Sequence, residues 1–87
     1  MHKHTKYVIR GSLRKNVLGA LMKPNTPTIL ARKLGTERSS VSRSILFLLA
    51  KGLVESLNPD DKRGRLYVIT NEGKKVLKDI KEMEGSP

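Results

Sequence analysis

The fold is decided by residues 34–55, which read Leu34-Gly35-Thr36-Glu37-Arg38-Ser39-Ser40-Val41-Ser42-Arg43-Ser44-Ile45-Leu46-Phe47-Leu48-Leu49-Ala50-Lys51-Gly52-Leu53-Val54-Glu55. The segment opens with a glycine turn and a capping threonine, and a Lys-Gly pair followed by a β-like run closes it. These signals predict one helix from about Glu37 to Lys51. At about 100° per residue, Val41, Ile45 and Leu48 form its inward stripe.

The outward side of the first half of this helix carries only short or cationic side chains. Arg43 is of the type that reads guanine through two hydrogen bonds, so we expect it to read a base. Ser39, Ser40 and Ser42 allow close approach to a duplex and hydrogen bonding. Arg38 is on the first turn, where the helix dipole also favours a phosphate. A serine-rich first turn is also typical of helix capping, so the neighbouring elements must decide between DNA contact and capping.

The composition favours a polyanionic partner. The chain of 87 residues has a net charge of +10, and residues 1–36 hold eight Lys/Arg and no acid. Such a balance suits phosphate neutralisation and counterion release. The chain has no cysteine, no apolar run near the roughly 20 residues of a membrane span, and no secretory signal at its start. We expect one domain over residues 1–87, located in the cytoplasm.

Two short helices precede residues 37–51. Residues 1–6 are predicted to form a basic tail, and residues 7–9 a strand or the lead-in to a helix. A helix from Ser12 to about Met22 carries Arg14 and Lys15 on its outer face. Thr26 then caps a second helix that begins at Pro27 and ends at Gly35. In that helix we expect Ile29, Leu30 and Leu34 to be buried. Together with residues 37–51, it forms a helix-turn-helix.

A β-hairpin and a last helix follow. Residues 53–57 and 65–69 have strand character, and residues 58–64 have turn chemistry throughout. Thr70 caps a helix from Asn71 to about Met83, and residues 84–87 form a frayed end. The chain is therefore predicted to be mainly α with a small β-hairpin. This is a winged helix-turn-helix with a three-helix core, a two- to three-stranded wing and a C-terminal helix.

The hairpin tip concentrates positive charge in Lys62, Arg63 and Arg65. Like charges so close together cost stability unless a polyanion accepts them, and the narrow A·T minor groove attracts arginine. Asp61 lies two residues before Arg63, so its carboxylate is expected to hold the Arg63 guanidinium by a charge-assisted bond. The alternative is a solvated charged turn that protects an edge strand.

The second half of residues 37–51 is apolar on every side. Besides the inward stripe, it carries Leu46, Phe47, Leu49 and Ala50. A helix that is apolar all round is normally buried. We expect this half to be covered in one of two ways: by the last helix of the same chain, through Val76, Ile80 and Met83, or by a second subunit.

Three separate places resemble one family. Asp61-Lys62-Arg63, five more residues, then Ile69-Thr70 and Asn71-Glu72-Gly73 resemble the D-x-R…[L/I]-T-x-x-G signature of the multiple-antibiotic-resistance regulator (MarR) family. Residues 34–43 and 51–55 are similar to the helix-turn-helix core of that family. The resemblance implies that Arg63 enters the minor groove with Asp61 as its positioning partner. It also implies a homodimer on a pseudo-palindromic site, in a prokaryotic and archaeal setting. Smaller archaeal winged-helix proteins are similar as well.

Other functional classes find little support. The sequence lacks the long extra helices with which the MarR family dimerises and frames a ligand pocket, so no small-molecule effector is expected. The histidines lie only in the first six residues, and there is no Gly-rich phosphate loop, zinc-ligand spacing or nucleophile elbow. We therefore expect no enzyme activity, no metal and no cofactor.

The sequence thus predicts a transcriptional regulator that binds double-stranded DNA. Residues 37–51 are expected to enter the major groove and residues 58–65 to meet the minor groove or the backbone, with Arg14 and Lys15 at the backbone. Two alternatives remain open. One is a protein-interaction winged helix, whose apolar patch around Phe47 docks a partner of the transcription or replication apparatus. The other is RNA binding, although the chain has few aromatic residues for base stacking.

Overall fold

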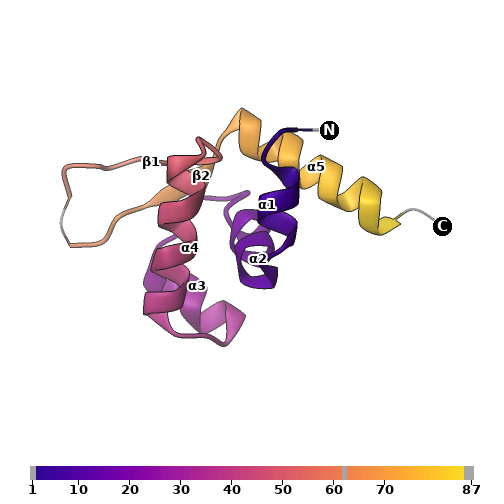
Figure 1. Ribbon diagram of the computed structural model, residues 1–87. Helices are drawn as coiled ribbons and strands as arrows, with labels where there is room; N and C mark the ends of the chain where they lie inside the picture. The colour runs from indigo at the N-terminus through magenta and orange to yellow at the C-terminus, as the bar shows by residue number, and fades with distance from the viewer. Residues whose placement is uncertain (1, 62, 86–87) are drawn as a thin grey trace.

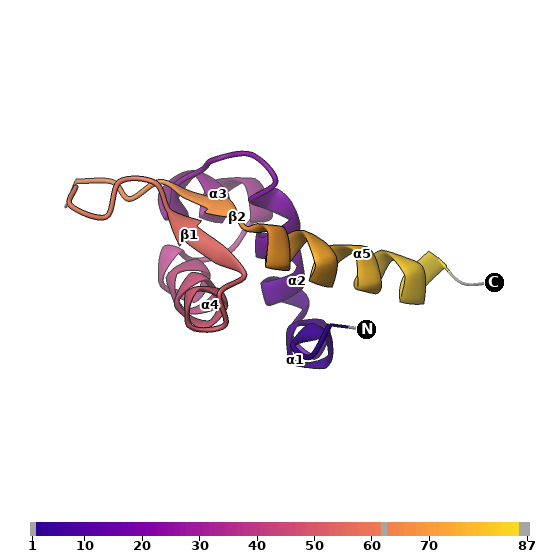
Figure 2. The same cartoon turned by 90° about the horizontal axis from the view of Figure 1, so that it is seen from above.

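Six of the seven elements were predicted from the sequence. The computed structural model describes residues 2–61 and 63–85, so Lys62 of the predicted site lies outside the described residues. The elements are α1 (Thr5–Ile9), α2 (Ser12–Ala20), α3 (Pro27–Leu34), α4 (Arg38–Ala50), β1 (Val54–Ser56), β2 (Tyr67–Ile69) and α5 (Asn71–Gly85). The loop that joins β1 to β2 and the C-terminal end of α5 lie at opposite ends of the molecule, with α2, α3 and α4 between them (Figures 1 and 2).

The start and the end of α3 have the predicted signals. The Thr26 hydroxyl accepts the Ile29 backbone N–H at 3.3 Å, and Pro27 occupies the first turn of α3. Gly35 closes the helix with a φ of 64°, a left-handed conformation that suits glycine. The prediction that a threonine caps α4 is wrong, because its N-cap is Glu37, whose side chain makes no capping hydrogen bond. Thr36 instead donates its backbone N–H to the Ala31 carbonyl at 3.0 Å, which completes the end of α3.

The inward face of α4 is as predicted, because Val41, Ile45 and Leu48 are all buried. They pack where α4 meets α2 and α3. One prediction for α3 is wrong, since Ile29 is 42% exposed. Leu30 and Ala31 take the inward positions of this two-turn helix, and Ile29 is turned to a different side.

The wing is a two-stranded antiparallel hairpin in which Val54 is opposite Ile69 and Ser56 is opposite Tyr67. Asn25, which lies just before α3, exchanges two backbone hydrogen bonds with Tyr67, each of 2.9 Å. The chain before α3 therefore acts as a short third partner of the hairpin. This bridge fixes the start of α3 beside the base of the wing.

A close backbone approach sets the direction of α5. Thr70 Oγ1 accepts the Gly73 backbone N–H at 3.1 Å and donates to the Gly52 carbonyl at 2.7 Å. Gly73 passes so near Leu53 that a Cβ there would lie 2.1 Å from the Leu53 carbonyl oxygen. As a result α5 leaves the end of α4 and packs on α1, α2 and β2. It extends through Gly85, so Glu84 and Gly85 belong to this helix and not to a frayed end.

The prediction of a solvated basic tail is wrong. Residues 5–9 form α1, and Thr5 and Val8 are fully buried. The carboxylate of Asp79 on α5 accepts the Thr5 hydroxyl at 2.8 Å and also the His2 backbone N–H. The His2 ring lies 2.7 Å from Glu72, again on α5. The N-terminal segment is ordered because α5 presents acidic side chains to it, and that partner is about 70 residues away in the sequence.

These contacts also shift ionisation. Hydrogen bonds from His2 and Thr5 hold the pKa of Asp79 below its ordinary range. Hydrogen bonds with His2 and Lys75 lower the pKa of Glu72 in the same way. Burial lowers the pKa of His4, and the nearby positive charges act in the same direction. In each case the fold favours the deprotonated form, although these three side chains are near the surface.

Candidate nucleic-acid interface

The polar side of α4 reaches the surface in its first half. Ser39 and Arg43 are exposed, while Ser40 and Ser42 are half-buried. Arg38 and Ser42 face one flank of the helix, and Ser40 and Arg43 face the other. Each flank borders a separate hollow, and the two hollows together surround the exposed edge of α4.

The first hollow joins three elements. It has a volume of about 590 Å³ and lies between the start of α3, the first turns of α4 and the wing. Its lining residues are Thr26, Pro27, Thr28, Ile29, Arg38, Ser42, Arg63, Gly64, Arg65 and Tyr67. Three arginines from two elements therefore line a single concave surface, without a carboxylate among the lining residues. Such a surface attracts an anion.

The start of α3 was missing from the predicted site. Thr26 and Thr28 bring hydroxyls to the first hollow, and the N-terminus of α3 adds a partial positive charge. Ile29 is exposed because it lines the same hollow. The sequence marked Thr26-Pro27 as a helix start, but only the bridge between Asn25 and Tyr67 shows that this start faces the wing.

The wing loop is held by local hydrogen bonds. Asn58 Oδ1 accepts the Leu66 backbone N–H at 2.6 Å, and Asn58 Nδ2 donates to the Gly64 carbonyl at 3.1 Å. Asp61 does not hold the Arg63 guanidinium as predicted. Its carboxylate accepts the Arg63 backbone N–H at 2.8 Å, because a short acidic side chain readily reaches the backbone two residues on. Asp61 therefore shapes the loop and leaves the guanidinium free to point outward.

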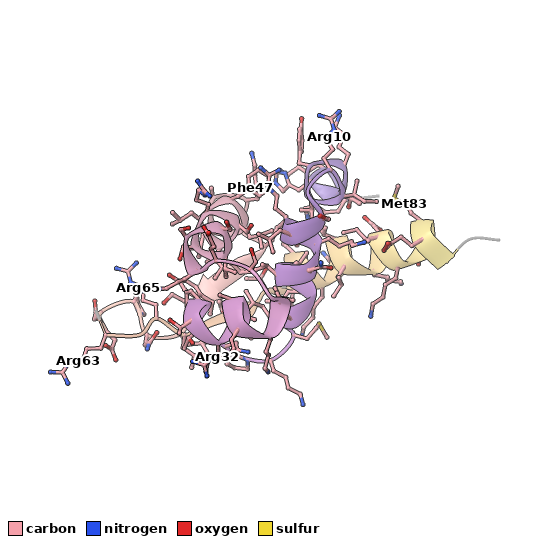
Figure 3. All side chains as sticks on the ribbon, turned by 90° about the horizontal axis from the view of Figure 1, so that it is seen from below. Arg10, Arg32, Phe47, Arg63, Arg65 and Met83 are labelled. Atoms are coloured by element: carbon pink, nitrogen blue, oxygen red, sulfur yellow. The ribbon has the colours of Figure 1, made fainter. Side chains whose placement is uncertain are left out.

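Both wing arginines point away from the body of the molecule (Figure 3). Arg63 and Arg65 are exposed. Within residues 2–61 and 63–85, neither guanidinium is paired with a carboxylate. The tip thus presents uncompensated positive charge beside the first hollow.

The second hollow lies on the other flank of α4. It has a volume of about 350 Å³ and is lined by Leu13, Arg14, Ser40, Arg43 and Ser44. Lys15 lines neither hollow. Its ammonium pairs with Glu84 of α5 at 2.9 Å, because neighbouring residues on a helix point about 100° apart. The fold therefore separates Arg14 from Lys15, which the sequence had grouped together.

The apolar half of α4 is not covered by α5. Val76 and Ile80 are buried, but α5 packs on α1, α2 and β2, and Met83 remains 45% exposed. Phe47 is half-buried against the core, and two cationic groups lie near the face of its ring. The Arg14 guanidinium is 3.9 Å and the Lys51 ammonium 5.7 Å from the centre of its ring. Leu49 also packs against the core, whereas Leu46 is 61% exposed. The prediction that α5 covers the apolar half of α4 is therefore wrong.

A membrane span and a metal site are two other features to compare with the described residues. No helix in the described part of the chain is long and apolar enough to cross a membrane. Among the same residues, no group of three His, Cys, Asp or Glu side chains is arranged to hold a metal ion.

Comparison with solved structures identifies the fold. A mutant of E. coli MarR complexed with operator DNA matches with a TM-score of 0.77 and 26% identity, over 97% of this chain and 62% of that chain. A complex of hsRosR matches with a TM-score of 0.81 and 26% identity, over 94% of this chain and 77% of that chain. The fold is a MarR-like winged helix-turn-helix.

The match covers nearly all of this chain but less than two thirds of the length of the MarR structures. A structure described as the multiple antibiotic resistance repressor MarR is 28% identical, with a TM-score of 0.76, over 93% of this chain and 63% of that chain. These neighbours are transcription regulators and not enzymes. No family model matches the sequence, and no curated protein matches it.

Proposed function

We propose that this protein binds double-stranded DNA in a sequence-specific manner and regulates transcription. The observation that carries the proposal is the first hollow, where the start of α3, the first turns of α4 and the wing bring Arg38, Arg63 and Arg65 to one concave surface. Sequence-independent affinity for DNA comes from such phosphate-facing cations. The likeness to E. coli MarR, whose mutant was solved with operator DNA, supports the same conclusion.

The geometry suggests a division of roles along α4. An α-helix fits the major groove, and the exposed edge of α4 carries Ser39 and Arg43. In this proposal Arg43 reads a base, while Ser39, Ser40 and Ser42 make close hydrogen bonds. Arg38 holds a phosphate at the N-terminus of the helix. The wing reaches the minor groove or the backbone through Arg63 and Arg65, and Lys62 remains a candidate for the same role.

Selection of bound fragments from a random duplex library tests the proposal. We expect a recurring sequence to be enriched, with binding that weakens steeply as salt rises. Arg43→Ala should cost about 1–3 kcal/mol of binding free energy and relax the preference at one base position. Arg63→Ala should weaken binding to all sequences alike. Lys75→Ala is the control, because Lys75 lies on α5 outside both hollows and pairs with Glu72.

Binding assays on the same protein separate the alternatives. If single-stranded RNA competes better than duplex DNA in a gel shift, the protein is an RNA binder. If no duplex binds at low salt, the protein-interaction reading is favoured. Equal losses on the selected and on random duplexes for Arg43→Ala would remove Arg43 from its assigned role.

We also propose a homodimer that works in the cytoplasm without a small-molecule effector. Leu46 and Met83 are apolar side chains that the fold leaves exposed, which suits contact with a second copy. Two copies related by a twofold axis require half-sites about ten base pairs apart, on the same side of the duplex. A monomeric mass in solution together with an asymmetric selected site would contradict the dimer.

A further inference from the structure

Two of the three aromatic side chains lie near a shared lysine and further cations. Tyr7 of α1 and Phe47 of α4 are surrounded by Lys6, Lys51 and Arg14. The Lys51 ammonium lies 5.7 Å from the Phe47 ring and 5.8 Å from the Tyr7 ring. The Arg14 guanidinium is much closer, at 3.9 Å from the centre of Phe47. At this distance the guanidinium is in contact with the ring, which is a favourable cation–π position.

The contacts of Arg14 leave most of its donors unused. A guanidinium has five N–H donors, and Arg14 Nη1 donates to the Tyr7 carbonyl oxygen at 3.2 Å. Contact with a ring face satisfies no N–H group. In the described part of the chain, no carboxylate pairs with Arg14. The group is therefore fixed in place while several donors remain available for a ligand.

Arg14 borders the second hollow together with Arg43. The hollow also contains Ser40 and Ser44, and Arg43 Nη2 lies 3.5 Å from Ser40 Oγ. Arg43 adds a second positive charge at the edge of this hollow, which favours an anion beside Arg14 while the Arg43 guanidinium stays available to a base. Arginine suits phosphate in particular, since its planar fork matches two phosphate oxygens.

We propose that the second hollow binds a DNA backbone phosphate, and that Phe47 is the positioning residue that holds Arg14 there. The inference rests on the proposed function and deepens it. A helix in the major groove has a phosphate backbone on each side. The wing and the first hollow serve one side of α4, and the Arg14–Arg43 hollow serves the other. Phe47 thus acts within the DNA interface, not as a site for docking a protein.

The first test compares two charge removals on the same helix. Arg14→Gln should reduce the slope of log K against log salt by about one and weaken binding to selected and random duplexes alike. Lys15→Gln removes the same charge from the next residue but faces α5, so its slope should equal that of the wild type. Thermal unfolding of each variant shows whether it is folded. An unchanged slope for a folded Arg14→Gln protein would overturn the proposal.

The second test asks whether Phe47 acts through Arg14. Phe47→Leu keeps an apolar side chain but removes the ring face, so affinity should fall, and Phe47→Tyr should restore it. In the Arg14→Gln background, Phe47→Leu should cause no further loss of affinity. An equal loss in both backgrounds would show a purely structural role and overturn the positioning claim. If the wild type binds no duplex, the proposed function itself fails. If the wild type binds but neither variant differs from it, only this inference fails.

Discussion

The N-terminal segment 2–9 and the wing tip 58–65 both carry several basic residues, but they are held in different ways. Residues 2–6 and 58–65 are both polar and basic, whereas residues 7–9 add a short apolar run to the first segment. In the structure, Thr5 and Val8 of the first are fully buried, and its hydrogen bonds reach Glu72 and Asp79, 70 to 77 residues away. Among the described residues of the wing tip, the side-chain hydrogen bonds come from Asn58 and Asp61 and span two to eight residues.

The difference shows that composition does not decide whether a basic segment is anchored. The first segment is anchored by carboxylates presented by another element and by the burial of Val8 in the core. Because α5 offers Asp79 and Glu72 to the N-terminal segment, that segment contributes to folding. No such partner reaches Arg63 or Arg65 in the described chain, so their charge remains available to a polyanion. We therefore expect variants of the first region to change stability and variants of the second to change binding.

The largest effect should come from Gly73, on which both regions depend. Its close approach to Leu53 places α5, which carries the acidic partners of the N-terminal segment, and also fixes the base of the wing. In Gly73→Ala the new Cβ would collide with backbone, so we expect a loss of about 3 kcal/mol in the free energy of unfolding. Chemical denaturation measures it. Gly85→Ala is the matched control, since nothing lies within 4 Å of a Cβ there. Equal stabilities of the two variants would contradict the tight junction.

Thr5→Val tests the anchored region by itself. The substitution keeps the shape of a fully buried side chain but removes the hydroxyl that donates to Asp79. We expect unfolding to become easier by about 1 kcal/mol, with unchanged affinity for DNA. Thr28→Val is the reciprocal control, because Thr28 is exposed and lines the first hollow. It should leave stability unchanged and weaken binding. The opposite pattern would remove the distinction between the two regions.

Acid should weaken the anchored region in two steps. The fold lowers the pKa of His4, so below its ordinary value of 6.5 the unfolded chain takes up the proton more readily and stability falls. It also lowers the pKa values of Glu72 and Asp79. Their contribution is complete above the ordinary values of 4.5 and 3.8, and it is lost as pH falls below them. Melting temperatures between pH 3 and pH 8 follow both steps.

Two variants test whether these side chains cause the pH dependence of stability. Asp79→Asn should remove part of the lower step and leave the upper step in place. Asn58→Ala, a wing variant without a titratable side chain, should reproduce the wild-type profile. A profile that is the same for Asp79→Asn and the wild type would show that the N-terminal contacts do not govern acid sensitivity.

The smallest effect on stability should come from the wing tip. Asn58→Ala removes two hydrogen bonds that close an exposed loop, and we expect a change within about 0.5 kcal/mol in the free energy of unfolding. Affinity for duplex DNA should nevertheless fall, because Arg63 and Arg65 lose their common support. Asp60→Ala is the control in the same loop. It removes a negative charge from the tip and should raise affinity. If Asn58→Ala lost stability but kept its affinity, the wing tip would serve folding and not DNA binding, and the comparison would fail.

Local chemistry made most of the fold predictable. The bounds of α3, the inward stripe of α4 and the capping role of Thr70 depend on signals within a few residues, and the structure confirms them. The exposure of Ser39 and Arg43 also follows from helical periodicity. Their roles in binding, and those of Arg38, Ser40 and Ser42, stay predictions.

The sequence by itself determined the order of the elements, the helix starts and stops, and the excess of positive charge. The tertiary structure decided which of those charges are neutralised, because an ion pair depends on the direction in which distant elements run. The turn at Gly73 sends α5 towards Lys15 and the N-terminal segment, and so away from Phe47. The bridge from Asn25 to Tyr67 brings the start of α3 to the wing. Neither placement has a signal within one helix or one turn, since each arises from backbone contacts between elements far apart in the chain.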